Sequence, residues 1–412
     1  MSLLLALVLA FPVAQDAHDG SSGDLSHAFQ LIKENSLVPI AEDRMASEAA
    51  RFMSMIPELQ PDAISPADVR DLPKLLAYFR ALRTSANGKL DERRLVEAAI
   101  NGMAASSGAR DGYIDLDAQR ELKCNCAASI GVSASLVGGM PVVVLTAPGS
   151  PSADILHEGD VITRIDGEST IGIGLDRFVA RLRGEPDSIV TLTVQRPGVD
   201  PAEIRLARKV NIAKPVSWRM EGAVGIITVS SLGPDVTSQV KQAIVALRDS
   251  SRKPEGYILD LRGNGGGLLS VASDLADIFM ASGPIGMQRG REPYDIERYA
   301  AKRGDDIRGL PLVVLTDRQT GSGAEIVAAA LQDTHRARIV GQKTFGNGLI
   351  QSIVPLSSHA AIRITTGQYF RGSGAPIQEV GVKPDIETPA GQEKGDDKTL
   401  KAALGLLAAP AS

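Results

Sequence analysis

The stretch Gly256-Tyr-Ile-Leu-Asp-Leu-Arg-Gly-Asn-Gly-Gly-Gly-Leu268 decides how the second half of the chain folds. Residues 256–261 are mostly apolar, which predicts a buried strand, and the glycines that follow predict a tight turn. Apolar residues then recur at helical spacing as far as Met280. A strand, a small-residue loop and a helix follow one another again between Leu312 and Leu331. Strands that alternate with helices in this way predict a βαβ-type body.

The rest of the chain differs from this body in its pattern. Its 412 residues exceed what one hydrophobic core usually serves, so several domains are expected. Apolar residues at helical spacing come first, and short β-branched runs between glycine turns follow them. The predicted regions are a leader, a helical region, a strand-rich region, the α/β region and a C-terminal tail, at residues 1–17, 25–121, 122–208, 209–390 and 391–412.

Composition limits the classes of partner and cofactor. Aromatic residues make up 4% of the chain and the net charge is −5, which argues against a surface that binds nucleic acid. Cys124 and Cys126 are too close together for an unstrained disulfide, and the five histidines show no ligand spacing near them. We therefore expect structural or incidental thiols, no metal site and no cofactor.

The N-terminus suggests where the protein is found. The run Met1-Ser-Leu-Leu-Leu-Ala-Leu-Val-Leu-Ala-Phe-Pro-Val-Ala14 is too short to cross a bilayer and matches the core of a signal peptide. We expect export to the periplasm or the extracellular space and no transmembrane segment. A mis-assigned start or a buried helix are the alternatives. For the helical region after it, the sequence leaves packing, a lid or self-association into a homo-oligomer open.

Two small-residue loops have both a catalytic and a purely structural interpretation. The glycines at 265–267 could turn N–H groups toward a developing negative charge, or could simply form a tight strand–helix turn. They match neither common phosphate-binding motif. In Thr320-Gly-Ser-Gly-Ala-Glu-Ile326, Ser322 could be a nucleophile at a helix N-terminus, but Ser322 and Glu325 also form the S-x-x-E pattern of a capping box.

The strand-rich region contains a segment that resembles the core of a PDZ domain. It runs Gly149-Ser-Pro-Ser-Ala-Asp-Ile-Leu-His-Glu-Gly-Asp-Val-Ile-Thr-Arg-Ile-Asp-Gly167, with a Gly-Asp turn before a strand that ends at Asp-Gly. PDZ domains bind an extended protein C-terminus along a sheet edge and hold its carboxylate with backbone N–H groups. The resemblance implies that protein or peptide C-termini are the partners, and that the carboxylate loop is Ser129, Ile130, Gly131 and Val132.

The α/β region resembles the C-terminal processing (tail-specific) serine peptidases. The turn at 260–267 is similar to their Asp-Leu-Arg-x-Asn-x-Gly-Gly motif, and Gly341-Gln-Lys-Thr-Phe-Gly-Asn-Gly-Leu-Ile-Gln351 is similar to a second one. The resemblance implies an α/β body of the ClpP/crotonase-like kind with an inserted PDZ-like domain. It makes Ser322 the nucleophile. Gly266, with its neighbour Gly267, and Gly323 would supply the oxyanion donors, and Gln351 would be the orienting residue.

The chain departs from that family at the position of the general base. Asn347 stands where the family has a lysine, and an amide has no usable basicity. Lys343 could substitute only through a bend at Gly346, and no histidine is marked as a replacement, although His335 or His359 could lie nearby. We therefore carry two hypotheses: a serine endopeptidase of weak or restricted activity that takes the tails of exported proteins, and an inactive pseudopeptidase that binds tails as a scaffold. A non-proteolytic hydrolase fits less well, because the PDZ-like segment indicates peptide ligands.

Overall fold

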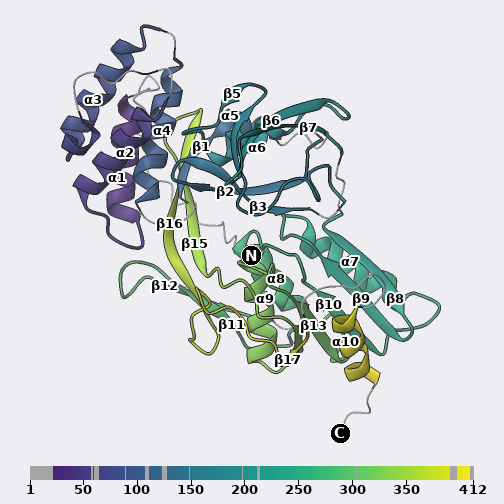
Figure 1. Cartoon of the computed structure of the whole chain (residues 1–412). Coiled ribbons are helices and arrows are strands. Elements are labelled where there is room, and N and C mark those ends of the chain that lie inside the picture. Colours follow the sequence, from purple (N-terminus) through teal and green to yellow (C-terminus); the bar gives the residue numbers. More distant parts are fainter. Residues whose placement is uncertain are drawn as a thin grey trace. The chain divides into compact units, whose positions relative to one another are not determined.

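A computed structural model describes residues 22–56, 59, 65–88, 90–106, 111–122, 128–147, 149–196, 198–210, 214–302, 304–389 and 397–408 (Figure 1). The chain divides into two compact units. Unit 1 comprises residues 1–211 and 352–364, and unit 2 comprises residues 212–351 and 365–412. The predicted leader and the pair of cysteines lie outside the described residues.

Unit 1 begins with a group of helices, as the sequence predicts. Asp71 accepts a hydrogen bond from the Lys74 N–H at the start of one helix and Asp91 accepts one from the Arg93 N–H at the start of another, which are typical N-caps. Their apolar faces pack into one core with Phe29, Met45 and Phe79 at its centre. The elements are α1 (Ser22–Asn35), α2 (Glu42–Ser54), η1 (Pro66–Asp68), α3 (Leu72–Ser85) and α4 (Glu92–Ala105).

A short strand and helix follow, still within unit 1. They are β1 (Gly112–Asp115) and α5 (Leu116–Leu122). Strand β1 pairs antiparallel with the first residues of β16 (Ala360–Arg371), so that Gly112 lies opposite Arg363. The buried residues Ala360, Ile362 and Ile364 of that strand join the core of the helices. This pairing joins segments that are far apart in the sequence.

The strand-rich region forms an antiparallel sheet with a separate core of its own. The strand order is β2-β3-β4-β6-β7, and β5 pairs with β4. Helix α6 packs on this sheet through Phe178 and Leu182, which are buried with Ile162 and Leu192. The elements are β2 (Val132–Val137), β3 (Met140–Thr146), β4 (Val161–Ile165), β5 (Glu168–Ser169), α6 (Leu175–Leu182), β6 (Ile189–Gln195) and β7 (Ala202–Ala207).

Unit 2 is built on a six-stranded sheet in the order β17-β14-β13-β10-β9-β8. All its neighbouring strands are parallel except β8, which forms a hairpin with β9. Every residue of β10 and β13 is buried, as expected for strands covered on both faces. The strands are β8 (Val216–Glu221), β9 (Val224–Val229), β10 (Gly256–Asp260), β13 (Leu312–Thr316), β14 (Arg338–Gly341) and β17 (Ile386–Glu387).

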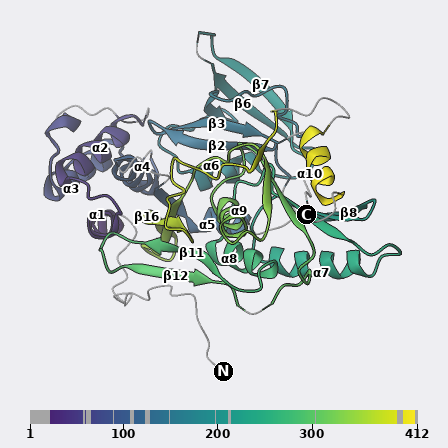
Figure 2. The ribbon, with the colours of Figure 1, turned by 90° about the horizontal axis from the view of Figure 1, so that it is seen from below.

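Helices cover both faces of this sheet. The helices α7 (Val236–Arg248), α8 (Leu269–Ile278) and α9 (Gly323–Asp333) share one core with Leu259 and Val314. The helix α10 (Lys398–Ala408) packs on the other face, against Ile258 and Val313 (Figure 2). The region that the sequence predicts as a C-terminal tail therefore contains a helix.

Three further strands belong to the sheet around β16, and the last of them continues from unit 2 into unit 1 at residue 352. The hairpin of β11 (Pro284–Arg289) and β12 (Ile296–Ala300) pairs with the last residues of β16, and Tyr299 stacks on Tyr369 beneath it. Strand β15 (Leu349–Pro355) also pairs with β16. The hairpin lies between α8 and β13 in the chain, β15 follows β14, and the sequence pattern did not predict these antiparallel strands.

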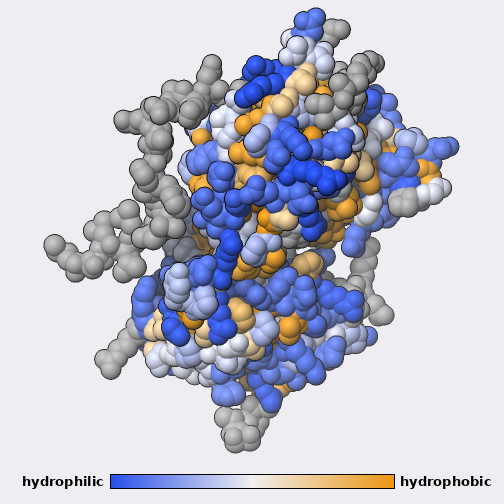
Figure 3. Space-filling view, turned by 90° about the vertical axis from the view of Figure 1, so that its left-hand side faces the viewer, coloured by the Kyte–Doolittle hydropathy of each residue, from blue (hydrophilic) through white to orange (hydrophobic). Residues whose placement is uncertain are grey.

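The surface in Figure 3 is mostly hydrophilic, with apolar residues scattered among the polar ones. Singly exposed apolar residues are normal on folded proteins and need no functional explanation. Among the helices that the structure describes, none is long and apolar enough to cross a membrane. The described part of the chain also contains no group of three His, Cys, Asp or Glu side chains that could hold a metal ion.

Candidate active site

Ser322 lies on a sharp turn between β13 and α9. Its backbone has φ 52° and ψ −122°, a conformation that residues other than glycine rarely adopt. Such backbone strain costs on the order of 1–3 kcal/mol, and it is typical of catalytic turns that raise a serine above the end of a sheet. The serine is the N-cap of α9, so its side chain is close to the positive end of the helix dipole.

The glycine-rich turn after β10 holds this serine turn from the side. The Gly321 N–H donates to the Asn264 carbonyl at 2.9 Å, and the buried Thr320 hydroxyl donates to the Leu261 carbonyl at 2.9 Å. A Cβ atom on Gly266 would lie 2.7 Å from the Gly323 nitrogen. Since Gly266 also has φ 98°, only glycine fits at this position.

The backbone N–H groups near Ser322 differ in whether they are available. The Gly266 N–H, which the sequence predicts as an oxyanion donor, already donates to Asn264 Oδ1 at 2.8 Å. The N–H groups of Gly267 and Gly323 have no hydrogen-bond partner among the residues that the structure describes. A Cβ built on Gly323 would lie 3.5 Å from the Gly267 nitrogen, so the two groups are neighbours. The geometry therefore favours Gly267, with Gly323, as the available pair of donors.

Glu325 is the centre of the hydrogen bonds around the site. It is fully buried on the first turn of α9, and its carboxylate accepts four hydrogen bonds. Oε2 accepts the Ser322 N–H at 2.8 Å, which is the carboxylate arm of the predicted capping box. The other donors are the Asn347 N–H to Oε2 at 2.8 Å, the Gly346 N–H to Oε1 at 2.7 Å and the Thr344 hydroxyl to Oε1 at 2.5 Å. These four bonds use the lone pairs of the carboxylate. Glu325 therefore anchors both the serine turn and the segment 344–347.

Asn347 therefore lies next to the serine turn, at the position that the sequence assigns to the general base. It is half-buried in the irregular segment 342–348 between β14 and β15, and Gly346 before it has φ 90°. A bend at Gly346 is thus present, but the side chain of Lys343 is exposed on the surface. Gln351, the predicted orienting residue, is half-buried on β15.

Of the two histidines considered from the sequence, His335 lies at the opposite end of α9 from Ser322, and His359 pairs with Asp117. His335 is exposed and comes after the last residue of α9, whereas Ser322 precedes the first. The 11 residues of α9 separate them by about 16 Å along the helix axis. His359 belongs to unit 1, where its Nδ1 is 2.8 Å from Asp117 Oδ2.

The four residues predicted for the carboxylate loop come just before β2 or begin it. The Ser129 N–H donates to the Lys209 carbonyl at 2.9 Å, so it is already used within the sheet. Gly131 has φ 75°, and its N–H donates to Ser129 Oγ at 3.3 Å. The Ile130 side chain is buried in the core, and Val132 opposite Thr146 begins the pairing of β2 with β3.

The Gly-Asp turn of the same module is held by an ion pair. Asp160 is 1% exposed, and its carboxylate accepts from Arg196 Nε at 2.7 Å and from the His157 N–H at 2.8 Å. The hydrogen bond from Arg196, with the one from the His157 backbone, holds the pKa of Asp160 below its ordinary value. The Asp at this turn is therefore a structural residue that orients the start of β4.

Comparison with known proteins agrees with this architecture. The model of peptidase family S41 matches residues 223–388, and that of the PDZ domain matches residues 142–196. A carboxy-terminal-processing protease of Bartonella bacilliformis is 36% identical over 341 residues, which cover 80% of this chain and 79% of that protein. The chain belongs to peptidase family S41. The family and the PDZ domain predicted from the sequence are thereby confirmed.

Two further proteins extend the likeness. A probable CtpA-like serine protease of Staphylococcus aureus is 30% identical over 373 residues, covering 84% of this chain and 73% of that protein. The solved structure of a photosystem II D1 C-terminal processing protease has a TM-score of 0.61 at 24% identity, covering 89% of this chain and 92% of that one. It has the same fold: N-terminal helices, a PDZ sheet and a mixed α/β peptidase body. The predicted fold class is therefore confirmed.

Two residues of this S41 site were missed or underrated in the sequence. Asn264 is fully buried, and its Nδ2 donates to the Val229 carbonyl at 2.9 Å while its Oδ1 occupies the Gly266 N–H. The S-x-x-E spacing indicated that Glu325 would cap α9 but gave no sign that it also binds the segment 344–347. A glutamate in the otherwise apolar stretch Ala324–Leu331 was the available signal.

Proposed function

We propose that the chain is a serine endopeptidase of the C-terminal processing type that cleaves exported proteins near their tails at a low rate. The observation that carries this proposal is the strained turn of Ser322, next to the N–H groups of Gly267 and Gly323, which have no partner in the part of the chain that the structure describes. A turn without a catalytic role would have little reason to keep this strain. Export rests on the apolar leader at residues 1–14, and recognition of tails rests on the PDZ domain.

In this mechanism the Ser322 hydroxyl oxygen attacks the carbonyl carbon of the scissile peptide bond. The N–H groups of Gly267 and Gly323 stabilise the negative charge that develops on the carbonyl oxygen. The C–N bond then breaks, the amine leaves with a proton, and water hydrolyses the acyl-enzyme. Because the amide of Asn347 cannot accept the serine proton, solvent water must take it. General-base catalysis typically raises a rate by about 10²–10⁴-fold, so the proposed rate of cleavage is lower by this factor than that of the same site with a lysine base.

Asn347 also favours a second candidate function. If solvent cannot replace the missing lysine, the S41 body binds tails without cleaving them, and the protein acts as a pseudopeptidase scaffold. The intact hydrogen bonds of Glu325 favour the first candidate, since they keep the serine turn and the base position in an ordered arrangement.

Cleavage of an unfolded protein substrate distinguishes the two candidates. Slow cleavage by the wild-type chain that disappears in Ser322→Ala supports the peptidase. No cleavage by the wild type, with cleavage in Asn347→Lys, supports the pseudopeptidase. Cleavage that persists in Ser322→Ala comes from another protein and contradicts the role of Ser322.

A further inference from the structure

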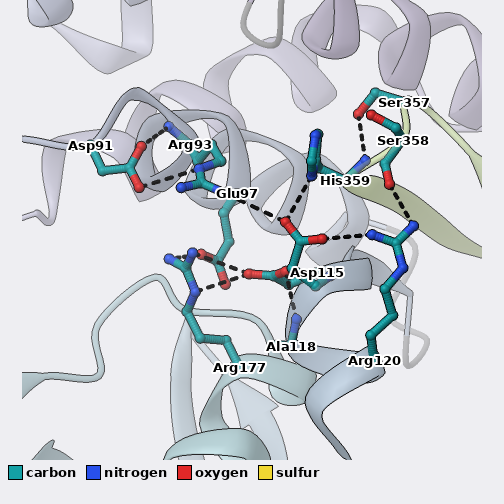
Figure 4. Close-up of polar contacts among 11 residues, drawn as sticks. Asp91, Arg93, Glu97, Asp115, Ala118, Arg120, Arg177, Ser357, Ser358 and His359 are labelled. Carbon is teal, nitrogen blue, oxygen red and sulfur yellow. Dashed lines mark hydrogen bonds and ion pairs between the residues drawn. The ribbon is translucent and has the colours of Figure 1, made fainter. Parts of the chain in front are cut away.

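A buried group of charged residues joins the PDZ domain to the N-terminal helices inside unit 1 (Figure 4). Glu97 of α4 is 1% exposed, and its Oε2 accepts from Arg177 Nη1 of α6 at 3.0 Å. Asp115 of β1 lies on the other side of the same guanidinium, with Oδ2 3.1 Å from Arg177 Nη2. Neither carboxylate belongs to the peptidase site.

Glu97 makes one contact that Asp115 does not. Its Oε1 accepts a hydrogen bond from the backbone N–H of Gly174, the N-cap residue of α6. A Cβ on Gly174 would lie 3.0 Å from the Tyr113 carbonyl oxygen and 3.1 Å from Glu97 Oε1, so the backbone of α6 approaches closely here. One turn further along α4, Asn101 donates to the Gly172 carbonyl at 3.3 Å. The start of α6 is therefore held from outside the PDZ domain.

Helix α6 presents different residues to the cluster, the core and the sheet. Arg177 points to the charged cluster, while Phe178 and Leu182 enter the PDZ core. Leu175 and Val179, one turn apart, are partly buried and pack on the same core as Val132 and Ala134 of β2. Among the described strands, β2 is the last of its sheet, so no described strand pairs with its outer edge. This arrangement matches a groove in which a peptide pairs with β2 and packs against α6.

We propose that Glu97 is a positioning residue for this peptide groove: through Gly174 and Arg177 it fixes the first turn of α6 relative to β2. The inference rests on the proposed binding of protein C-termini by the PDZ domain. Under this proposal, α4, a helix outside the PDZ domain, helps to set the affinity of the PDZ domain for its peptide. Because Gly174 immediately precedes Leu175, a shift of the helix start also moves the apolar wall of the groove.

Two substitutions separate this role from a general effect on the cluster. Glu97→Gln replaces one carboxylate oxygen by an amide N–H₂, which must then face either the Gly174 N–H or the Arg177 guanidinium. Asp115→Asn also removes one negative charge beside Arg177, but it leaves the hydrogen bond between Glu97 and Gly174 intact. The amide oxygen that this substitution leaves can still accept the N–H groups of Asp117 and Ala118, as Asp115 Oδ1 does. The second variant is therefore a matched control.

The first measurement is the affinity of the full chain for a fluorescein-labelled peptide with an apolar, free C-terminus, with the amidated peptide as reference. At pH 8, above the raised pKa of Glu97, Glu97→Gln should weaken binding by about tenfold, the value of one charged hydrogen bond, and Asp115→Asn should stay within about twofold of the wild type. Unchanged affinity in Glu97→Gln overturns the proposal, as does an equal loss in Asp115→Asn.

The second measurement is hydrogen exchange without peptide, which does not depend on the proposed function. Glu97→Gln should speed exchange in residues 172–179 and leave β6 in the PDZ core as protected as in the wild type. Equal acceleration in both segments would mean general destabilisation and would overturn the proposal. A wild type that does not prefer the free carboxylate to the amide contradicts C-terminus binding instead, and hydrogen exchange still decides whether Glu97 positions α6.

Discussion

Ser322 and Asn347 are fixed to the same atom: their backbone N–H groups both donate to Glu325 Oε2, each at 2.8 Å. The proposed nucleophile and the residue at the proposed position of the general base therefore share one buried anchor, although 24 residues separate them in the sequence. The side chain at position 347 is an amide, while the backbone at this position is held in place by its bond to Glu325.

Replacing Glu325 should destabilise both the serine turn and the segment 344–347. In Glu325→Gln an amide N–H₂ faces two of the four donors, so two buried N–H or O–H groups lose their partner. We expect the free energy of unfolding of unit 2 to fall by roughly 2–4 kcal/mol, measured by chemical denaturation. Any cleavage that depends on Ser322 should fall with it.

Glu379→Gln is the control for Glu325→Gln. Glu379 is an exposed glutamate whose backbone contacts Gly346, so the same chemical change is made beside the same loop without burial. It should leave stability unchanged within about 0.5 kcal/mol. Equal effects of the two substitutions would contradict the anchoring role of Glu325.

A lysine at position 347 should accelerate cleavage with a characteristic pH profile. In Asn347→Lys the backbone keeps its bond to Glu325, and the half-buried site favours a neutral amine, which lowers the pKa of the new lysine. Cleavage of an unfolded substrate should rise by about 10²–10⁴-fold and should increase with pH as the amine loses its proton. The measurement is initial rate against pH.

Two companion variants test the source of that activity. Adding Ser322→Ala to Asn347→Lys should abolish cleavage, because the nucleophile is then missing. Lys343→Ala in the wild-type chain should change nothing, since that side chain is exposed on the surface. A loss of wild-type cleavage in Lys343→Ala would show that Lys343 acts as the base after all.

Local patterns in the sequence predicted elements whose partners are close along the chain. The strand Gly256–Asp260 and the helix Leu269–Ile278 lie where the sequence predicts a strand at 256–261 and helical spacing as far as Met280, because apolar runs and helical spacing are properties of the segment itself. The long strand Ala360–Arg371 was not predicted. It exists because Gly112–Asp115 and Gly286–Arg289 pair with it, and local sequence carries no record of such distant partners.

The candidate site shows the same limit at the level of single atoms. Resemblance identified Ser322, Gly323 and Asn347, and the structure brings these residues together. It could not reveal that the Asn264 side chain occupies the Gly266 N–H, because that depends on a rotamer in a buried turn. Nor could it reveal three of the four donors of Glu325, which come from the segment 344–347 after the next strand.

The stability of unit 1 should depend on pH through Glu97. Burial raises the pKa of Glu97 to about 7, from an ordinary value of 4.5. Arg177, the Gly174 N–H and Arg181 oppose this rise, and Asp115 adds to it. A raised folded-state pKa means that the stabilising contribution is complete below 4.5 and is lost as pH rises through 7.

The comparison with Glu97→Gln isolates this contribution. The variant does not titrate at this position, so the difference in free energy of unfolding, wild type minus variant, should decrease by about 1.4 kcal/mol per pH unit from roughly pH 5 to 7. Above about pH 7 it should level off. Chemical denaturation at a series of pH values measures it, and a difference that grows with pH would contradict the burial argument.

Arg262 of the glycine-rich turn should control the docking of α10. Its Nη1 lies 2.9 Å from both carboxylate oxygens of Asp397, and its Nη2 lies 2.6 Å from Asp260 Oδ2. Asp397 in turn accepts the Leu400 N–H at 2.9 Å at the start of α10. Lysine cannot reproduce this planar double pairing, so Arg262→Lys should lower the free energy of unfolding by about 1–3 kcal/mol.

The measurement is hydrogen exchange in residues 398–408, which should become faster in Arg262→Lys. The control Arg338→Lys, on the exposed start of β14, should leave this exchange unchanged. Unchanged exchange in Arg262→Lys would mean that the apolar contacts of Ala403 and its neighbours alone hold α10 on the sheet.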